Sequence, residues 1–494
     1  MALLEIMDQI QCRVFKFLEE QKLLFIALGI AVICLIRFYK IDDASLWVDE
    51  AFSIFYAQQP ISNIIERATQ GVNPPFYNIL LHYWIKLWGI SELATRSLSA
   101  LFSVASIVLI FKFGKRYFNL QTAVFSAGIL LVSNIHQFYA HEARGFAMVS
   151  FLCLWSFYVY LDLFKSSTKA KIVLLAIINA LLLYSHLVTI FLLLSQLIGA
   201  VFLFRRNKEG LKSYLLSKLL TLLLYLPWIY VIFNIYEKYT TGNMVSWLQV
   251  PGISDLKWLF VQFASNKWLI YGYLVLIVFS VFLLVQKKLF TSKQVDRNKF
   301  WILILWGFFP VLACFIFSQF IPVFWPRYLM YSSVGLILFV SYLISILPFK
   351  SSIRTLIFLF FFSISFGVQN LNPYKGENWK QAVPIVHENC TNNSLIIVSA
   401  WYCHRVFAYY YDRNSFEDYE STVSRLKDLK AHCINNGAGF ENINTEGIER
   451  VILVQAHKAV VDPKNTLTKA IEADGYSQVK EQNYSGVYVA VFDK

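Results

Sequence analysis

Residues 23–39 read LLFIALGIAVICLIRFY, and residues 46–53, shortly after this run, read LWVDEAFS. The first stretch contains one charged residue, Arg37, and is about long enough for a helix to cross a bilayer. The second stretch places Asp49 and Glu50 side by side just beyond that crossing. Carboxylates beside a membrane are costly unless something uses or neutralises them. The pair therefore indicates an acid/base or acceptor-binding element of a membrane enzyme, with an ordinary solvated loop as the alternative.

The rest of the chain has the same apolar character. Hydrophobic residues make up 57% of its 494 residues and charged residues 15%, and the mean hydropathy is +0.52. This composition excludes an ordinary soluble globular protein, and apolar stretches long enough to span a membrane recur. The formal net charge of +13 falls on residues 1–371, because Asp and Glu slightly outnumber Lys and Arg in residues 372–494. The excess of basic residues therefore lies in the membrane part and does not indicate nucleic-acid binding.

Lys and Arg cluster in short loops between the apolar stretches, which is typical of cytoplasmic loops. These loops are Lys112–Arg116, Lys165–Lys171, Arg205–Lys218, Lys287–Lys299 and Lys350–Arg354. The pattern predicts a polytopic α-helical membrane protein with about 11 transmembrane helices, with Met1–Lys22 inside and residues 372–494 outside. The predicted spans are 23–39, 93–111, 119–136, 145–164, 172–185, 187–204, 215–235, 258–286, 300–320, 328–347 and 354–371.

The first outer loop, residues 40–92, is long in this topology. Its apolar stretch Pro75–Gly89 is short for a span and begins with two prolines. We therefore predict that it forms a helix lying in the membrane interface. Long loops of this kind often carry function.

Residues 1–371 are expected to form the transmembrane domain, and residues 372–494 a small extracytoplasmic α/β domain. Apolar runs predict three strands, and polar stretches predict helices over Trp379–Glu388 and Ser421–His432. The predicted strands are Ser394–Ala400, Val451–Gln455 and Val487–Phe492. This tail has no glycine-rich phosphate loop, so a lid, docking or scaffolding role is expected. At most one disulfide can form among Cys390, Cys403 and Cys433, and the spacing does not select a pair.

Unusual polar residues gather in the outer loops of this topology. Residues 136–145 read HQFYAHEARG, residues 322–328 read PVFWPRY, and His186 lies at a predicted hairpin turn. The chemistry fits sugar transfer from an anionic lipid carrier. A carboxylate can deprotonate an acceptor hydroxyl, and arginine can stabilise the charge on a leaving phosphate.

Several short motifs follow one another along the chain. They are Trp47–Ala51, Asn73–Tyr77, His82–Trp84, Arg96–Ala100, Gly114–Arg116, His141–Arg144 and Pro326–Leu329. This ordered set resembles the GT-C membrane glycosyltransferases. The similarity is to the family 39-like branch of protein O-mannosyltransferases and the lipid A aminoarabinose transferase, and it covers about residues 23–371. It implies a polyprenyl-phosphate-linked sugar donor, an inverting one-step transfer and a site on the extracytoplasmic face.

The resemblance also implies roles for individual residues. Asp49 is expected to be the catalytic base or acceptor ligand, with Glu50 supporting it. Acceptor or sugar binding is expected for Glu142, His141 and His186, and carrier-phosphate binding for Arg327 and Arg144. Asn73 departs from the family pattern, because the aminoarabinose enzyme has a lysine there near the lipid phosphate. The tail does not resemble the sugar-binding repeats of eukaryotic O-mannosyltransferases, so a protein acceptor is not specifically implied.

Structural alternatives remain open for these residues. Asp49 could be a helix N-cap, Glu142 could pair with Arg144, and Arg327 could be an interfacial side chain with its charge at the surface. His136 and His141 do not make a convincing metal site, so no metal or other cofactor is expected, although a divalent ion stays open.

The competing function is a transporter or flippase of lipid-linked sugars, which would place ionisable residues inside the spans. A ligase of lipid-linked polymers would share the carrier but would not need the Asp49–Glu50 pair. We expect an integral membrane protein of the bacterial inner membrane, acting in the cell envelope on a lipid, glycan or protein acceptor, with no nucleic-acid partner.

Overall fold

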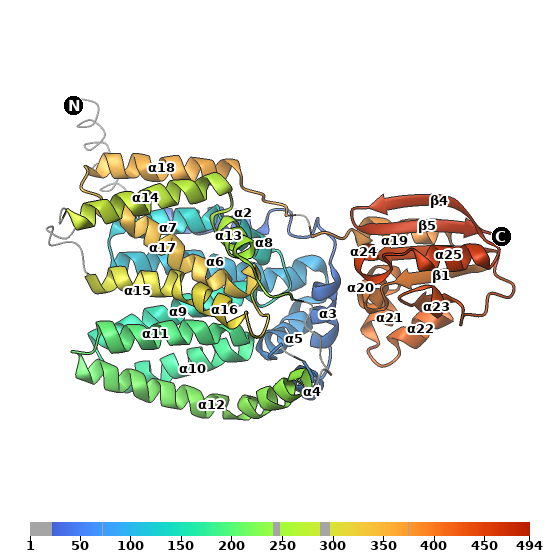
Figure 1. The fold of residues 1–494 in the computed structure, drawn as a ribbon, viewed down its shortest axis with the longest axis horizontal. Helices are drawn as coiled ribbons and strands as arrows, with labels where there is room; N and C mark the ends of the chain where they lie inside the picture. The colour runs from blue at the N-terminus through green and yellow to red at the C-terminus, as the bar shows by residue number, and fades with distance from the viewer. Residues whose placement is uncertain (1–21, 72, 241–247, 287–296, 374) are drawn as a thin grey trace.

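The computed structural model describes residues 22–71, 73–240, 248–286, 297–373 and 375–494. Nearly all of the predicted cytoplasmic segment Met1–Lys22, with Cys12, and most of the basic loop Lys287–Lys299 lie outside these residues. A helical bundle fills one end of the molecule and a small sheet domain the other (Figure 1). The α-helical class with an appended α/β unit is thus confirmed at the level of the fold.

A helix occupies each predicted span. The bundle consists of α2 (Lys22–Phe38), α6 (Glu92–Tyr117), α7 (Leu120–Leu131), α8 (Asn134–Ala140), α9 (Phe146–Lys165), α10 (Lys169–Ser185), α11 (Ile190–Leu203), α12 (Lys208–Thr240), α13 (Ile253–Ala264), α14 (Lys267–Val285), α15 (Arg297–Gly307), α16 (Phe309–Phe317), α17 (Met330–Ile346) and α18 (Ser351–Gly367), with short 3-10 turns η1 (Leu187–Thr189) and η2 (Pro326–Leu329).

Among the described residues, five helices are long and apolar enough to cross a membrane, or up to seven if each bent pair forms one span. The bent pairs are α7 with α8, at 60°, and α13 with α14, at 91°. Ser265 follows α13 with φ of 67°, a left-handed conformation that ends a helix. Because of this bend, the long predicted span 258–286 is two helices.

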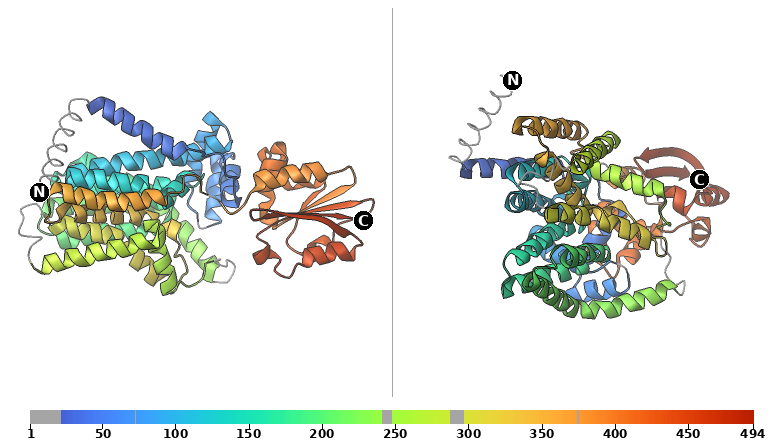
Figure 2. Two further views of the ribbon diagram at one scale, coloured as in Figure 1. Left: turned by 90° about the horizontal axis from the view of Figure 1, so that it is seen from above. Right: turned by 60° about the vertical axis from the view of Figure 1, so that its left-hand side comes forward.

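Three helices of the first loop close one end of the bundle. They are α3 (Val48–Ala57), α4 (Ile61–Thr69) and α5 (Phe76–Trp88), and they lie between the bundle and the sheet domain (Figures 1 and 2). Helix α5 coincides with the predicted interfacial helix. It buries Leu81 and Ile85 while Leu87 and Trp88 are largely exposed, the amphipathic character expected of such a helix.

The sheet domain contains five strands in the order β2-β1-β3-β5-β4. Strand β1 is parallel to β2 and β3, whereas β5 is antiparallel to both β3 and β4. The elements are α19 (Trp379–Asn389), β1 (Ser394–Ser399), η3 (Trp401–Cys403), α20 (His404–Tyr411), α21 (Arg413–Glu417), α22 (Thr422–Asp428), β2 (Ala431–Cys433), α23 (Gly437–Phe440), β3 (Arg450–Ala456), α24 (Lys458–Val461), α25 (Thr466–Ala473), β4 (Ser477–Tyr484) and β5 (Val487–Asp493).

The predicted helix Ser421–His432 is wrong at its C-terminal end. Helix α22 stops at Asp428, and Lys430 has φ of 58°. Ala431 and His432 then pair with β1 as strand β2. Tertiary pairing therefore overrides the helical pattern of the last residues.

Helix α20 of the sheet domain packs on α3. The amide of Leu46, just before α3, donates to the Tyr410 hydroxyl at 2.8 Å, and this hydroxyl donates to Glu92 at 3.0 Å. Tyr409 donates to the carbonyl oxygen of Ile90 at 2.9 Å. The sheet domain is therefore attached to the loop that carries the acidic pair.

Candidate active site at the loop end of the bundle

Asp49 lies between two arginines from distant parts of the chain. Its Oδ2 is 3.3 Å from Arg327 Nη1 and 3.7 Å from Arg144 Nη2. Asp49 is in the first turn of α3, whose N-cap is Trp47, so it is not the N-cap. Its side chain is 32% exposed, against 12% for Arg327 and 15% for Arg144. The carboxylate thus stays accessible while the two guanidinium groups are largely enclosed.

Aromatic rings surround the Arg327 guanidinium. Its Cζ lies 5.7 Å from the ring centres of Trp47 and Phe146 and 5.4 Å from that of Tyr328. Arg144 also lies over Phe146, at 5.9 Å, and donates to the Ser53 hydroxyl at 3.3 Å. Stacking of this kind orients a planar guanidinium, and such groups bind phosphate oxygens in pairs. The two arginines can therefore hold an anion beside Asp49.

Glu50 points away from Asp49 into the protein. Its two oxygens accept from Nε and Nη2 of Arg96 at 2.8 Å each, and Oε1 also accepts from the Ala143 amide at 2.9 Å. Burial alone would raise the pKa of Glu50, but the Arg96 guanidinium holds it below its usual value. Arg96 also donates to the carbonyl oxygen of Ser45. Glu50 can thus support Asp49 only indirectly, by fixing α3.

Glu142 is fully buried, and neither of its oxygens has a hydrogen-bond partner among the described residues. No ion pair joins it to Arg144 in the part of the chain that the structure describes. Burial raises the pKa of Glu142 to about 7, although the nearby positive charges of Lys375, Arg327 and Arg144 act to lower it. A buried carboxyl without a partner needs an explanation, and a ligand that donates to it is one.

Lys375 is a site residue that the sequence did not reveal. It follows α18 in the connection to the sheet domain, yet its side chain is buried. Its Nζ donates to the carbonyl oxygen of Phe138 at 3.1 Å and lies 3.8 Å from the centre of that ring. Burial lowers the pKa of Lys375 to about 8, while Glu142 and Glu50 oppose this shift. In the sequence it is one lysine in a polar connection, and no pattern indicates that it lies near the predicted outer loops.

The two predicted histidines have different surroundings. His186 lies 4.5 Å from the Tyr328 ring and beside Phe146, and burial with the charges of Arg327 and Arg144 lowers its pKa to about 3. His141 is buried, with Nε2 2.9 Å from the carbonyl oxygen of Arg37 at the end of α2. The structure therefore brings His186 to the arginines, whereas the His141 ring contacts α2.

No group of three or more His, Cys, Asp or Glu side chains that could hold a metal occurs among the described residues. The six cysteines within the described ranges are free thiols, Cys390, Cys403 and Cys433 included.

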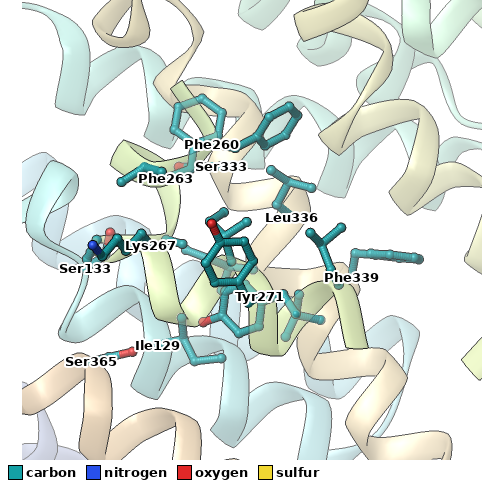
Figure 3. A pocket seen from close by; sticks show the side chains of 18 of the residues that line it. Ile129, Ser133, Phe260, Phe263, Lys267, Tyr271, Ser333, Leu336, Phe339 and Ser365 are labelled. Atoms are coloured by element: carbon teal, nitrogen blue, oxygen red, sulfur yellow. The ribbon is translucent and has the colours of Figure 1, made fainter. Parts of the chain in front are cut away.

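An apolar cavity of about 490 Å³ lies in the bundle. Helices α13, α14 and α17 form much of its wall, and Phe260, Tyr271 and Phe339 line it (Figure 3). Its lining extends from the first turn of α17, at Ser333, to the middle of that helix. Arg327 belongs to η2, directly before α17, and precedes Ser333 by six residues. The cavity and Arg327 therefore lie along one continuous stretch of chain, η2 followed by α17.

Comparison with known proteins finds one family profile and several solved structures that are similar to this chain. Residues 72–231 match the profile of the dolichyl-phosphate-mannose-protein mannosyltransferase family. No curated protein sequence matches the chain. ArnT from Cupriavidus metallidurans in the apo state is similar with a TM-score of 0.58 and 12% identity, over 94% of this chain and 97% of that chain.

The same ArnT bound to undecaprenyl phosphate is similar with a TM-score of 0.54 and 13% identity, over 94% of this chain and 98% of that chain. These matches confirm the resemblance to GT-C membrane glycosyltransferases that the sequence motifs indicated.

Proposed function

We propose that this GT-C-type membrane protein transfers a sugar from a polyprenyl-phosphate carrier to an acceptor hydroxyl on the extracytoplasmic face. The observation that carries the proposal is the Asp49 carboxylate held between Arg144 and Arg327. One group can take a proton, and the other two can bind a phosphate, which are the two requirements of this reaction. The family match and the ArnT-like fold support the same reaction class.

The proposed reaction is a single displacement at the anomeric carbon. The oxygen of the acceptor hydroxyl forms a bond to that carbon, while Asp49 accepts the proton of this hydroxyl. The bond from the anomeric carbon to the carrier phosphate breaks, and the phosphate leaves with the electron pair. Arg327 and Arg144 stabilise the added negative charge. Attack on the face opposite the phosphate inverts the configuration of the sugar.

Glu142 is proposed to bind the sugar. Since its pKa is raised to about 7, the carboxyl is partly protonated near neutrality and can donate to a sugar oxygen or accept from a hydroxyl. Either contact supplies the partner that the buried carboxyl lacks among the described residues. His186, beside Tyr328, is proposed to line the same space as a neutral ring.

The apolar cavity beside α17 is proposed to receive part of the carrier's isoprenoid chain. Its lining is dominated by aromatic and aliphatic side chains, and its volume of about 490 Å³ is in the ordinary range of ligand pockets. ArnT, which has a similar fold, is known with bound undecaprenyl phosphate. A chain in this cavity would leave its phosphate at the Arg327 end of α17.

The proposal also includes the number of membrane crossings and the side of the membrane on which the sheet domain lies. We infer about 11 crossings, with the sheet domain on the extracytoplasmic side, from the alternating basic loops. The turn between α11 and α12, which contains Arg205 and Arg206, lies at the end of the bundle remote from the sheet domain (Figure 1). This arrangement supports placing the site and the sheet domain on the outer face.

The proposal is tested by comparing lipid-linked sugars extracted from cells with and without the protein and identified by mass. Loss of the protein should cause one polyprenyl-phosphate sugar to accumulate, and purified protein in lipid vesicles should consume that lipid in the presence of acceptor. Movement of the intact lipid across the vesicle membrane with no release of carrier phosphate would instead favour a flippase.

A further inference from the structure

The sheet domain turns the carboxyl ends of its parallel strands toward the bundle. The chain ends after β5 at the end of the molecule farthest from the bundle (Figure 1). Strand β3 is antiparallel to β5, so β3 and its parallel neighbour β1 run toward the bundle. From β1 the chain continues to β2 on one side, and from β3 it continues to β4 and β5 on the other. In open α/β sheets, ligands bind outside the carboxyl ends of strands at such a reversal.

Three side chains at this edge form a chain of hydrogen bonds. His457, directly after β3, donates from Nε2 to Glu377 Oε1 at 2.9 Å, and its Nδ1 lies 2.8 Å from the Tyr402 hydroxyl. Tyr402 follows β1, and Glu377 belongs to the connection that also carries Lys375. Trp379 fixes Glu377 by donating to its other oxygen at 2.6 Å. The bridge between β1 and β3 therefore positions the Tyr402 hydroxyl at the edge of the sheet.

The His457 side chain is accessible at this edge. It is 34% exposed, although it makes two hydrogen bonds. A ligand at this edge can therefore reach the hydrogen-bonded chain of Glu377, His457 and Tyr402.

Trp401 adds an exposed aromatic face beside Tyr402. Its side chain is 51% exposed, and its ring stacks on that of His404 with an interplanar angle of 16°. The Trp401 amide donates to the side-chain oxygen of Asn435 at 3.0 Å, which fixes the backbone at this point. A large, rigid and accessible aromatic surface next to an oriented hydroxyl is suited to a ligand with one apolar and one polar face.

This edge of the sheet domain adjoins the helix that carries Asp49. Helix α20, which begins two residues after Tyr402, packs on α3. The Arg405 guanidinium of α20 lies 5.3 Å from the ring centre of Phe52 in α3 and donates to the Tyr56 hydroxyl at 3.3 Å. Asp49 and the edge that holds Tyr402 therefore belong to neighbouring, packed elements.

We propose that the edge of the sheet at the carboxyl ends of β1 and β3 is the acceptor subsite, and that it binds a sugar ring. The ring stacks on the Trp401 indole, and one of its hydroxyls bonds to the Tyr402 hydroxyl, which the Glu377–His457 pair positions. Its attacking hydroxyl then points toward Asp49. The assignment rests on the proposed glycosyl transfer, and it selects a glycan acceptor over a protein hydroxyl.

The test uses the full-length protein in lipid nanodiscs and a benzophenone-bearing hexoside as the probe. After irradiation, peptide mapping should locate the label on the segments that contain Trp401–Tyr402 or His457–Lys458. Excess underivatised hexoside should prevent the labelling. Trp401→Ala should reduce it about 10-fold, the loss expected when one aromatic stack disappears. Since Trp401 is exposed, this variant should fold normally.

Matched variants separate the subsite from general effects. His432→Gln, which changes a histidine of β2 in the same sheet, should label as the wild type does, and Trp401→Phe should retain part of the labelling. Label on other segments, or labelling of this sheet edge by a benzophenone-bearing serine peptide in place of the hexoside, would overturn the assignment. Asp49→Asn should label normally while transferring no sugar. Absence of transfer by the wild type with intact labelling would instead reject the proposed function alone.

Discussion

At the scale of single residues, the charges at Asp49 do not cancel. Two guanidinium groups approach one carboxylate, so one positive charge remains uncompensated by that carboxylate. An anion is the natural partner for this surplus. The arrangement therefore suits a site that holds a phosphate and a proton acceptor together.

We expect Asp49→Asn to lower the rate of sugar transfer at least about 100-fold, the low end for loss of a general acid or base. The amide has nearly the same shape but cannot accept the proton. Arg327→Ala should weaken donor binding and turnover together, because it acts on the carrier phosphate before and during the reaction. Steady-state kinetics with a purified polyprenyl-phosphate sugar measure both effects.

Asp43→Asn provides the control for these variants. Asp43 lies in the same loop, but it forms an exposed ion pair with Lys40 and should leave kinetics unchanged. Near wild-type turnover by Asp49→Asn would refute the assigned mechanism.

Glu142 should make the stability of the protein depend on pH. Its pKa rises from the usual 4.5 to about 7 in the folded protein, so the folded state retains a proton that the unfolded state releases. Stability should therefore fall as the pH rises from about 4.5 to about 7 and remain lower above that range. Glu142→Gln should remove this pH-dependent loss of stability, because the glutamine side chain cannot ionise.

The measurement is the midpoint of thermal denaturation of both proteins in detergent at pH 4.5 and pH 8. The midpoint of Glu142→Gln minus that of the wild type should be larger at pH 8 than at pH 4.5. An equal difference at the two pH values would show that the carboxyl does not titrate in this range.

The sequence predicts part of this site and misses another part for a physical reason. Asp49, Arg144 and Arg327 stand out because charge is rare near membrane spans and therefore conspicuous. Lys375 lies in a polar connection where charged side chains are ordinary, so only the folded arrangement brings it to the site. The buried contact between Glu50 and Arg96 also follows from the tertiary fold, and no sequence pattern indicates it.

At the scale of elements, helix α3 depends on one buried ion pair. Arg96 of α6 bonds to Glu50 of α3 and to carbonyl oxygens of the preceding turn. Glu50→Gln should destabilise the protein by about 3 kcal/mol, because the buried guanidinium loses its counter-charge. It should also reduce transfer, since α3 carries Asp49. Thermal denaturation and transfer assays measure the two losses.

The double variant Glu50→Leu with Arg96→Met tests the cause. It removes both buried charges and should be more stable than Glu50→Gln. Lys40→Ala, which breaks an exposed pair, should change stability by less than about 1 kcal/mol. A double variant less stable than the single one would show that the helix contact depends on shape and not on charge.

The accuracy of the predicted elements follows the strength of their patterns. Long apolar runs predict the helices of the bundle well, because each run must remain apolar over many turns. The three predicted strands match β1, β3 and β5, which are buried and apolar. Strand β4 has almost entirely exposed, polar side chains and offers no such pattern, and β2 has only three residues.

At the scale of the whole molecule, the inferred topology predicts opposite compartments for two positions. A reporter fused after Lys494 should be active outside the cytoplasm, and one fused at Lys350, in a basic loop between α17 and α18, should be active inside. Helix α18 lies between Lys350 and the sheet domain, and the inferred topology counts it as one crossing. Activity of both fusions in the same compartment would reject the outer placement of the site.

The position of Lys375 late in the chain also determines the order in which the parts of the site are synthesised. The ribosome produces Asp49, Glu142, Arg144 and Arg327 well before it produces the connection after α18. Until that connection folds back, no ammonium lies beside the buried Glu142, and the edge of the sheet with its exposed indole does not yet exist. An unfinished chain in the membrane thus holds an incomplete site. Under the proposed function, the reaction site is complete only after the sheet domain has been synthesised and has folded.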